Sequence, residues 1–312
     1  AKYGRNHPFV KTQLFNEEIN AEGGMFPPAR RALMQGSHPR QIAPRPGAIY
    51  AFLLDVAGED EGAVSGQSIV TALANPLRDS TSLTIVEVEL STLADPLIAA
   101  PTYHAVERCL WVGVKHTTLY GILRAHVTTW KPRFVVADAT GVGAGLTSFL
   151  DTTFPNRVIP FVFNHATKSQ LGWEFLAVVE TGRWQDWAVP DTQTDPESTT
   201  FWRELTAVQY QAGSNQTLKW GVPEGTRDPA TGEVVHDDTV LSAALCAVLD
   251  KQPWQIAAGQ IGEEPDPGQP VELAYHVGET ETAILFIQHR GSHALLFDEV
   301  LTRGRPDQAL QA

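Results

Sequence analysis

The stretch AIYAFLLDVAG at residues 48–58 decides the fold class of this chain, because it is a nearly continuous apolar run that ends in Asp55 and a glycine. Such a run is typical of a central strand buried on both faces. The stretch RFVVADAT at residues 133–140 repeats the arrangement, with Asp138 at the end of its apolar run. The two stretches therefore predict two buried strands that each end in an aspartate.

The rest of the chain supplies further strands and helices around these two. Alternating or apolar patterns predict strands at 66–74, 82–90, 157–163 and 217–225, and helical spacing predicts helices within 103–130, 146–154, 169–182, 199–210 and 236–250. Three strands, a helix, then strand, helix, strand and more helices make an α/β chain. This order predicts a mixed sheet with helices on its faces.

The flanking regions differ from this central part. Residues 1–46 are rich in proline and read as an irregular arm with one short helical candidate at Thr12–Ile19. We expect the compact fold to begin at Gly47 and to span 47–257. Residues 258–312 open with a linker-like GEEPDPGQP and then give three short strand candidates, which predict a small β appendage.

Charge is the first guide to partners. The 312 residues include 36 acidic and 23 basic side chains, for a formal net charge of −13. This balance argues against nucleic acid, since phosphate binding uses Lys and Arg. The charge is uneven, however, because residues 1–46 hold seven basic and three acidic side chains. The acidic excess therefore belongs to the centre and the tail of the chain.

Membrane insertion, export and thiolate metal sites are not expected. No window approaches the ~18 apolar residues that a membrane helix needs, and the first residues lack a hydrophobic signal core. Cys109 and Cys246 lie far apart without a pairing pattern. We therefore expect a soluble protein of a reducing compartment.

Carboxylates are the strongest candidates for chemistry. Ligands of open α/β sheets collect at the carboxyl ends of strands, where Asp55 and Asp138 lie. A third acidic position opens the last predicted helix, at His236-Asp237-Asp238. One of these aspartates is explained as a helix cap, worth roughly 1 kcal/mol, but two in succession exceed what a cap requires. Either side chain is placed to point at the sheet.

Converging carboxylates predict a metal site. Oxygen-rich sites suit Mg²⁺ or Mn²⁺ and not Zn²⁺, and clustered acids without cations would repel one another. Two such ions about 3.5–4 Å apart activate water and stabilise the leaving oxygen of a phosphodiester. The residue pattern therefore indicates nuclease chemistry.

The loop Gly141-Val142-Gly143-Ala144-Gly145 invites a second reading, as a dinucleotide-binding loop. Leu146 stands where the third glycine of that pattern belongs, so we interpret the loop as a turn that keeps the backbone clear of Asp138. Gly141 and Gly143 are candidate phosphate contacts, and Lys168 is a candidate cation for the scissile phosphate. No lysine follows a glycine, so the chain holds no GKS or GKT phosphate loop.

These motifs resemble a known family. LLDVAG, VVADATGVGAG and above all VPEGTRDPATGEVVHDDTVLSAAL are similar to the nuclease domain of a tailed-phage or prophage terminase large subunit, over roughly residues 47–250. The resemblance implies a ribonuclease H-like fold with a five-stranded mixed sheet and two divalent ions. Asp55 matches the first-strand acid, Asp138 the fourth-strand acid, and the pair Asp237-Asp238 the helix acid.

The same resemblance implies a biological setting. The activity would be endonucleolytic cutting of concatemeric viral double-stranded DNA during packaging, in the cytoplasm of a bacterial host. The terminase small subunit and the portal protein are the implied partners, and no membrane is implied. The arm at 1–46 is similar to the segment that joins an ATPase to the nuclease, and the ATPase itself is absent from this sequence.

Three alternatives remain open from the sequence. A resolvase or transposase of the same fold would prefer branched or end-specific DNA. A non-catalytic module that docks to a motor or capsid would bind no divalent ion. A phosphotransferase of the actin and sugar-kinase type would need a second copy of the strand and helix unit, and the chain shows one.

Overall fold

The main sheet is built around β1 (Tyr50–Asp55), all six of whose side chains are buried. β1 pairs in parallel with β4 (Phe134–Asp138), which is also buried throughout, and antiparallel with β2 (Ser80–Glu89). Burial on both faces explains why β1 and β4 carry continuous apolar runs and not an alternating pattern. The two buried strands predicted from the sequence are confirmed.

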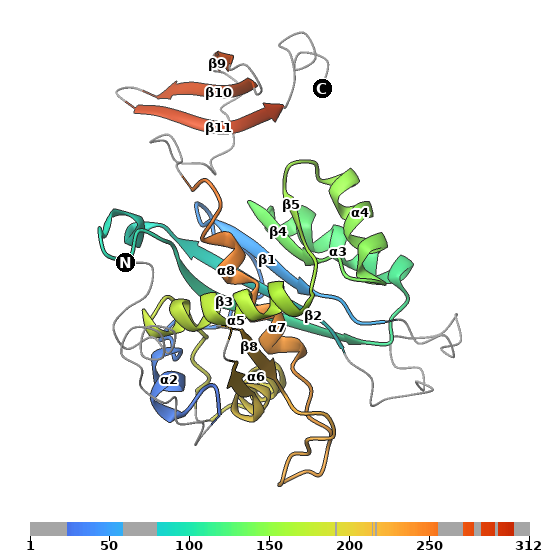
Figure 1. Ribbon diagram of the computed structural model, residues 1–312. Helices are drawn as coiled ribbons and strands as arrows, with labels where there is room; N and C mark the ends of the chain where they lie inside the picture. Colours follow the sequence, from blue (N-terminus) through green and yellow to red (C-terminus); the bar gives the residue numbers. More distant parts are fainter. Residues whose placement is uncertain are drawn as a thin grey trace. The chain divides into compact units, whose positions relative to one another are not determined.

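The computed structural model describes residues 24–58, 80–190, 192–213, 215 and 217–254, together with the backbone of 271–277, 282–290 and 293–302 (Figure 1). The remaining elements are α2 (Pro28–Leu33), a short 3₁₀ helix (Ser91–Ala94), β3 (Thr102–Val112), α3 (His116–Trp130), α4 (Gly143–Thr153), β5 (Val158–Phe161), α5 (His165–Glu180), β6 (Trp184–Gln185), α6 (Pro196–Ala207), β7 (Gln209–Ala212), β8 (Leu218–Gly221), α7 (Asp238–Ala244), α8 (Cys246–Leu249), β9 (Val271–Val277), β10 (Thr282–Arg290) and β11 (His293–Thr302). Contacts divide the chain into two units, one from residues 1–43 and 49–252 and the other from 44–48 and 253–312.

The strand order of the larger unit is β5-β4-β1-β2-β3-β6. β5 runs parallel to β4, whereas β2 is antiparallel to both β1 and β3. Three meander strands followed by two parallel strands on the far side of β1 form a ribonuclease H-like sheet, so the predicted fold class is confirmed. The sheet has six strands where five were predicted. Four of the predicted strands are β1, β2, β4 and β5, whereas β3 and the two-residue β6, which pairs in parallel with the edge of β3, were not predicted as strands.

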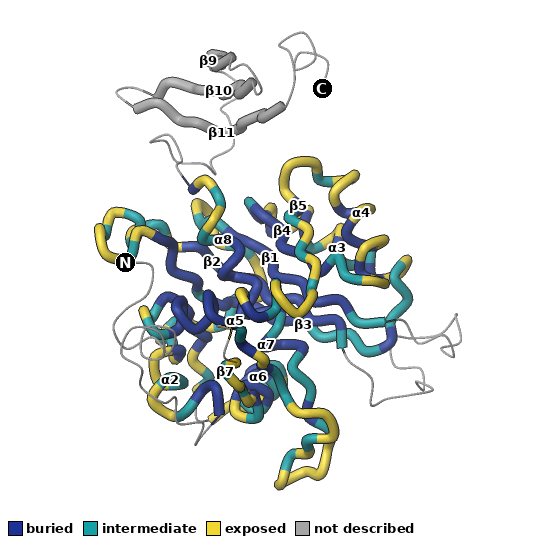
Figure 2. Tube along the Cα trace, viewed as in Figure 1, coloured by how far each residue is buried: buried dark blue, intermediate teal, exposed yellow. Residues whose placement is uncertain are grey.

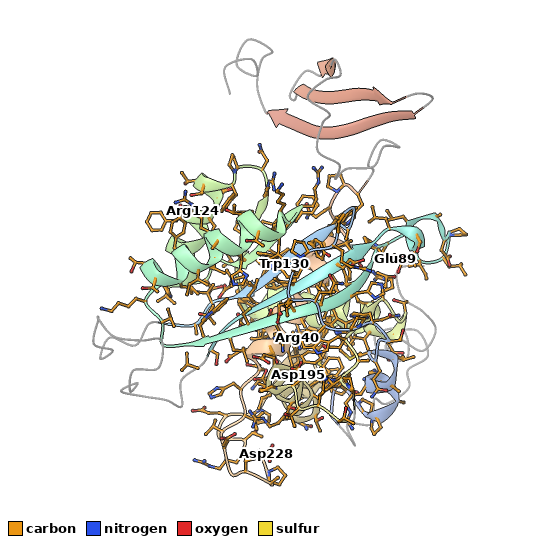
Figure 3. All side chains as sticks on the ribbon, turned by 180° about the vertical axis from the view of Figure 1, so that it is seen from behind. Arg40, Glu89, Arg124, Trp130, Asp195 and Asp228 are labelled. Atoms are coloured by element: carbon orange, nitrogen blue, oxygen red, sulfur yellow. The ribbon has the colours of Figure 1, made fainter. Side chains whose placement is uncertain are left out.

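Helices cover both faces of this sheet. α7 packs against β1 and β2, α8 against β4, and α4 against β4, β5 and α3. Figure 1 shows α5 and α7 in front of the strands, and Figure 3 shows α3 from behind, marked by Arg124 and Trp130. Figure 2 shows that burial is concentrated in the central strands and the helices that lie on them.

The prediction of a helix across most of 103–130 is wrong for its first part. Thr102–Val112 forms β3, which pairs along its length with β2, and the helix begins only at His116. Tyr103, Ala105 and Val106 are fully buried within the strand. The apolar residues of this segment fit the spacing of a helix and also that of a strand, and the pairing with β2 decides in favour of the strand.

Part of the predicted arm packs into the larger unit. Met25, Phe26 and Met34 are at most 1% exposed, and Gln35 bridges to Asp186 beside β6. The compact fold therefore includes residues before Gly47, because apolar side chains between the prolines find a place in the core. The helix predicted at 12–19 and the strand predicted at 66–74 lie outside the described residues.

The smaller unit contains the three predicted strands. They form an antiparallel sheet in the order β11-β10-β9. In the described part of the chain, no helix is long and apolar enough to cross a membrane.

Candidate metal centre

Asp55 and Asp138 end two neighbouring parallel strands. The register pairs Leu54 of β1 with Ala137 of β4, so each aspartate follows at the same edge of the sheet. Their exposed fractions are 8% and 6%. The structure therefore brings together two carboxylates that the sequence placed at strand ends.

Helix α7 brings the other two predicted carboxylates to this edge. Ser242 anchors the helix, because its hydroxyl donates to the backbone oxygen of Leu53 in β1 at 2.8 Å and contacts a threonine hydroxyl of β2 at 2.9 Å. Asp237 and Asp238 lie at the start of α7 and both act electrostatically on Asp55. All four predicted aspartates thus belong to one cluster, which we call the acidic centre.

Asp237 and Asp238 have different surroundings. Asp238 is 5% exposed, and its Oδ2 accepts a hydrogen bond from the backbone N–H of Ser80 at 2.6 Å. Oδ2 of Asp237 lies 3.4 Å from the donating backbone nitrogen of Val222 and 3.6 Å from Nζ of Lys168. Asp237 is the N-cap residue of α7, but its side chain makes no capping hydrogen bond. Helix capping therefore does not explain this acidic pair.

Burial and repulsion act together on Asp55. Burial is the main cause that raises the pKa of Asp55 well above its usual range, and the charges of Asp238, Asp138 and Asp237 raise it further, in that order. The charge of Lys168 acts in the opposite direction. Without an added cation, Asp55 therefore holds a proton more readily than a free aspartate does.

Hydrogen bonds stabilise the charged form of Asp138 more than that of Asp55. Burial raises its pKa, but hydrogen bonds from Thr140 and from the backbone of Val56 oppose that shift. The backbone N–H of Thr140 donates to Oδ1 of Asp138 at 2.8 Å. The net pKa of Asp138 is still raised, although by less than burial alone would cause.

The donor chemistry of the acidic centre fits a hydrated divalent cation. All four side chains offer carboxylate oxygens, which are the preferred ligands of Mg²⁺ and Mn²⁺. In the described residues, no three His, Cys, Asp or Glu side chains are close enough to surround one ion. Mg²⁺ keeps several waters and commonly needs only one or two carboxylates, so a set of three protein ligands around one ion is not required.

The glycine loop and Lys168 lie beside these carboxylates. Gly141 has a φ of 51°, and the backbone N–H of Gly143 donates to Thr140 at 2.9 Å to close the turn after β4. Lys168 lies near the start of α5, and its Nζ is 5.5 Å from the ring centroid of Trp220. The phosphate contacts expected of Gly141, Gly143 and Lys168 stay predictions.

Gly143 and Gly145 form a matched pair for a stability test. A Cβ on Gly143 would lie 2.6 Å from the backbone oxygen of Asp138 and 3.2 Å from Cβ of Val56, whereas one on Gly145 would meet nothing within 4 Å. We expect Gly143→Ala to cost about 1–3 kcal/mol through overpacking, and Gly145→Ala to stabilise α4 by about 0.5–1 kcal/mol. Urea unfolding of both variants checks this, and equal midpoints would contradict it.

Sequence reasoning did not single out Glu204 on α6, which is 4% exposed. Its Oε2 accepts hydrogen bonds from the backbone N–H of Thr239, at 2.9 Å, and from the Thr239 hydroxyl. Burial is the main cause that raises its pKa to about 8, and the charge of Asp238 adds to the shift. A signal was available, because Glu204 shares the apolar face of its helix with Phe201 and Leu205, where a carboxylate needs a partner.

The metal-free protein should lose stability as the pH rises from about 6.5 to 8. The pKa of Glu204 is raised to about 8 and that of Asp55 well above its usual range, so the folded state holds protons that the unfolded state has released. Stability from such groups is full below the unfolded pKa, near 4, and is lost as the pH rises through the folded pKa. Urea unfolding in EDTA measures the change.

The half-buried histidines act in the opposite sense to these carboxyls. Burial lowers the pKa of His38 and of His126 below the usual 6.5, so their contribution to stability still rises over the lower part of the window and offsets a small part of the decline. Glu204→Gln should flatten the decline between the two pH values. Stability that is constant or rises from pH 6.5 to 8 in the wild type would contradict the expectation.

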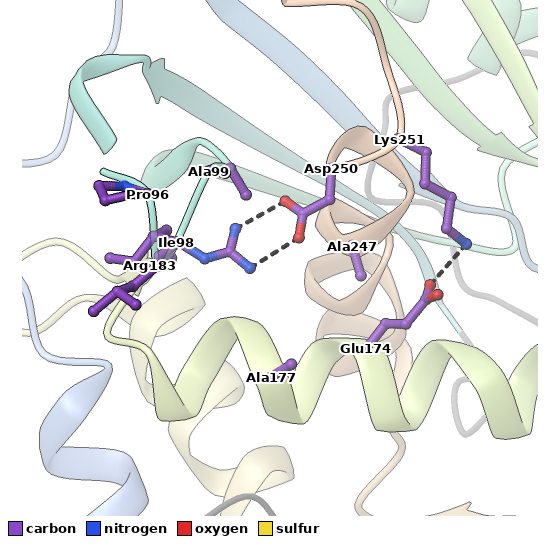
Figure 4. A pocket seen from close by; sticks show the side chains of 11 residues that line it. Pro96, Ile98, Ala99, Glu174, Ala177, Arg183, Ala247, Asp250 and Lys251 are labelled. Atoms are coloured by element: carbon purple, nitrogen blue, oxygen red, sulfur yellow. Dashed lines mark hydrogen bonds and ion pairs between the residues drawn. The ribbon is translucent and has the colours of Figure 1, made fainter. Parts of the chain in front are cut away.

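A pocket of about 340 Å³ lies elsewhere in the larger unit. Figure 4 shows that two ion pairs line it together with the loop at 96–100. Arg183 makes two hydrogen bonds of 2.8 Å to Asp250, and Nζ of Lys251 lies 2.9 Å from Glu174. None of the predicted site residues lines this pocket, so it is separate from the acidic centre.

Comparisons with known proteins were made by sequence and by structure. No family model and no curated protein matches the sequence. The structure is similar to the large terminase nuclease from thermophilic phage G20c with bound magnesium, with a TM-score of 0.49 and 18% identity over 73% of this chain and 98% of that chain. It is also similar to the nuclease domain of the Thermus phage P74-26 large terminase, with a TM-score of 0.44 and 19% identity over 71% of this chain and 93% of that chain.

A longer protein gives a similar match. The large terminase from another thermophilic bacteriophage, in complex with ATP-gamma-S, aligns with a TM-score of 0.47 and 11% identity over 78% of this chain and 49% of that chain. The G20c nuclease was also crystallised with cobalt and with zinc. All of these solved structures are of phage large terminases or of their nuclease domains.

Proposed function

We propose that this chain is a divalent-metal-dependent DNA endonuclease that cuts concatemeric viral DNA during genome packaging. The observation that carries the proposal is the convergence of Asp55, Asp138 and the Asp237-Asp238 pair from two strand ends and one helix start of a ribonuclease H-like fold. The resemblance of the surrounding motifs to terminase nucleases supports the same conclusion. Asp55, Asp138 and Asp238 are the proposed ligands of two Mg²⁺ or Mn²⁺ ions.

Asp238 is proposed as the main helix ligand because it is buried beside β2, where the Ser80 amide donates to its Oδ2, whereas Oδ2 of Asp237 faces Lys168. Asp237 lies against Lys168 and supports the centre from its more exposed side. When bound, the two ions would activate a water and stabilise the leaving oxygen of a phosphodiester. The chain's own part is to hold Asp55, Asp138 and Asp238 in place and to offer Lys168 to a phosphate.

A divalent-ion titration followed by a nicking assay on the same protein tests this function. We expect saturable binding of Mn²⁺ by calorimetry and Mn²⁺-dependent nicking of supercoiled plasmid, with EDTA abolishing both. A folded protein that binds no Mn²⁺ and nicks no DNA would favour the non-catalytic docking module. Linear, supercoiled and four-way DNA should be cut without preference for the branched form, whereas such a preference would favour a resolvase.

Lys168 should contribute to DNA affinity through a phosphate. We expect Lys168→Ala to weaken duplex binding about equally across sequences and to reduce the slope of log affinity against log salt by about 1. Lys219→Ala is the matched control, because Lys219 is exposed on the neighbouring strand β8. Fluorescence anisotropy of a labelled duplex over a range of KCl concentrations measures both. Identical slopes for Lys168→Ala and wild type would contradict the assigned contact.

The proposed setting is the cytoplasm of a bacterial host. There the terminase small subunit and the portal protein would be the protein partners, and double-stranded DNA the substrate. Because the chain carries a net charge of −13, its grip on DNA depends on local cations and on any partner that also binds DNA. Activity should therefore fall steeply as salt rises.

A further inference from the structure

The first turn of α7 is capped from outside the helix. Asp237 occupies the N-cap position, where an aspartate normally accepts a hydrogen bond from the second or third helical amide. Its side chain makes no such bond. The amide of Thr239, the second residue of α7, donates instead to Oε2 of Glu204 at 2.9 Å.

The contact between α6 and α7 holds the start of α7 in one placement. The Thr239 hydroxyl donates to the same oxygen of Glu204, so both donors of one residue meet one acceptor. Thr239 is fully buried and Glu204 is 4% exposed, which excludes water as a substitute. Two bonds to one oxygen fix both the position and the rotation of the helix start.

This arrangement releases Asp237 from the cap. Its Oδ2 turns toward Val222 and Lys168, while Asp238 accepts from Ser80. Were Asp237 to cap the helix, its carboxylate would fold back on the amides of α7 and leave the acidic centre. Because Glu204 accepts these hydrogen bonds, the carboxylates of Asp237 and Asp238 make their contacts outside the helix start.

We propose that Glu204 is a positioning residue of the acidic centre: by capping α7 in place of Asp237, it orients Asp237 and Asp238 toward the ion site. This inference rests on the proposed function. Glu204 acts through Thr239. Groups that orient metal ligands from behind typically change metal affinity by about 10–100-fold when they are removed.

Mn²⁺ calorimetry on four proteins tests the proposal. We expect Glu204→Ala to raise the Mn²⁺ dissociation constant about 10–100-fold relative to wild type. Glu204→Gln should stay within about threefold, because its amide oxygen accepts the same two hydrogen bonds. Asp195→Ala is the control for simple loss of α6 stability, because Asp195 caps α6 through the amide of Ser198, and it should bind Mn²⁺ like wild type.

The outcomes separate this inference from the proposed function. A wild-type protein that binds no Mn²⁺ overturns the proposed function and the inference with it. If the wild type binds and folded Glu204→Ala binds equally well, or if Asp195→Ala weakens binding as much, only the inference is overturned. If Glu204→Ala does not fold, Thr239→Val decides, since it removes one of the two bonds: weakened Mn²⁺ binding supports the proposal and unchanged binding overturns it.

Discussion

Asp55→Asn and Asp138→Asn proteins should nick plasmid DNA in Mn²⁺ on the order of 10³-fold more slowly than wild type. Stabilisation of transition-state charge by a metal ion is worth several kcal/mol, and each 1.4 kcal/mol is a factor of ten in rate. Asp238→Asn should match these two. Asp237→Asn should lose less, because Asp237 lies against Lys168 and is more exposed than the other three.

Asp55→Asn should raise the stability of the metal-free protein, although it lowers the nicking rate. Asp55 is buried beside three other carboxylates, and its pKa is raised by burial and by their charges. Asparagine is neutral without taking up a proton, so it avoids the cost of protonating or charging a buried carboxyl, and metal-free Asp55→Asn should melt at a higher temperature than metal-free wild type. Loss of activity together with gain of stability is the pattern of a site that is held ready for a cation.

Glu174→Gln is the matched control for these variants. Glu174 is also a buried carboxylate, but it pairs with Lys251 beside the separate pocket. The Glu174→Gln protein should nick plasmid DNA at the wild-type rate. Wild-type nicking by Asp55→Asn or by Asp138→Asn would refute the proposed function.

Arg108→Ala should destabilise the larger unit by about 3–5 kcal/mol, because it leaves a buried charge without its partner. Nη2 of Arg108 lies 2.7 Å from Oδ2 of Asp186, and both side chains are fully buried. The guanidinium is held between two rings, with its centre 4.7 Å from the Trp187 centroid and 4.2 Å from that of Phe201. The pair joins β3 to the segment after β6.

A double variant separates the net contribution of this ion pair to stability from the penalty of leaving one of its charges buried and unpaired. Arg108→Met with Asp186→Asn removes both charges and should recover a large part of the stability that Arg108→Ala loses. Urea unfolding of Arg108→Met, of Asp186→Asn and of the double variant gives the coupling energy. A loss below about 1 kcal/mol in Arg108→Ala would contradict the expectation, since surface pairs have that magnitude.

The sequence predicts the site best where a local pattern has one physical meaning. Asp55 and Asp138 end runs that are too apolar for anything except buried strands, and neighbouring parallel strands place such residues at one edge. β3 shows the opposite case. Its apolar residues suit a helix or a strand, and only pairing with β2 decides between them.

The helix acids show a second limit of sequence reasoning. Asp237 and Asp238 look like a cap, and a cap is the commoner use of an aspartate before a helix. The decisive fact is that Glu204 does the capping, and its position depends on how α6 packs against α7. No local pattern around residue 237 carries that information.

The hydrogen bonds that hold α7 on the sheet also bear on when during synthesis the acidic centre can exist. Ser242 and Leu53 are 189 positions apart, and Asp238 and Ser80 are 158 apart. A ribosome delivers the two strand-end acids long before the helix acids, and contacts of such long range form late in folding. The growing chain is therefore unable to assemble the complete centre, and the proposed cutting activity would arise only after nearly the whole larger unit has folded.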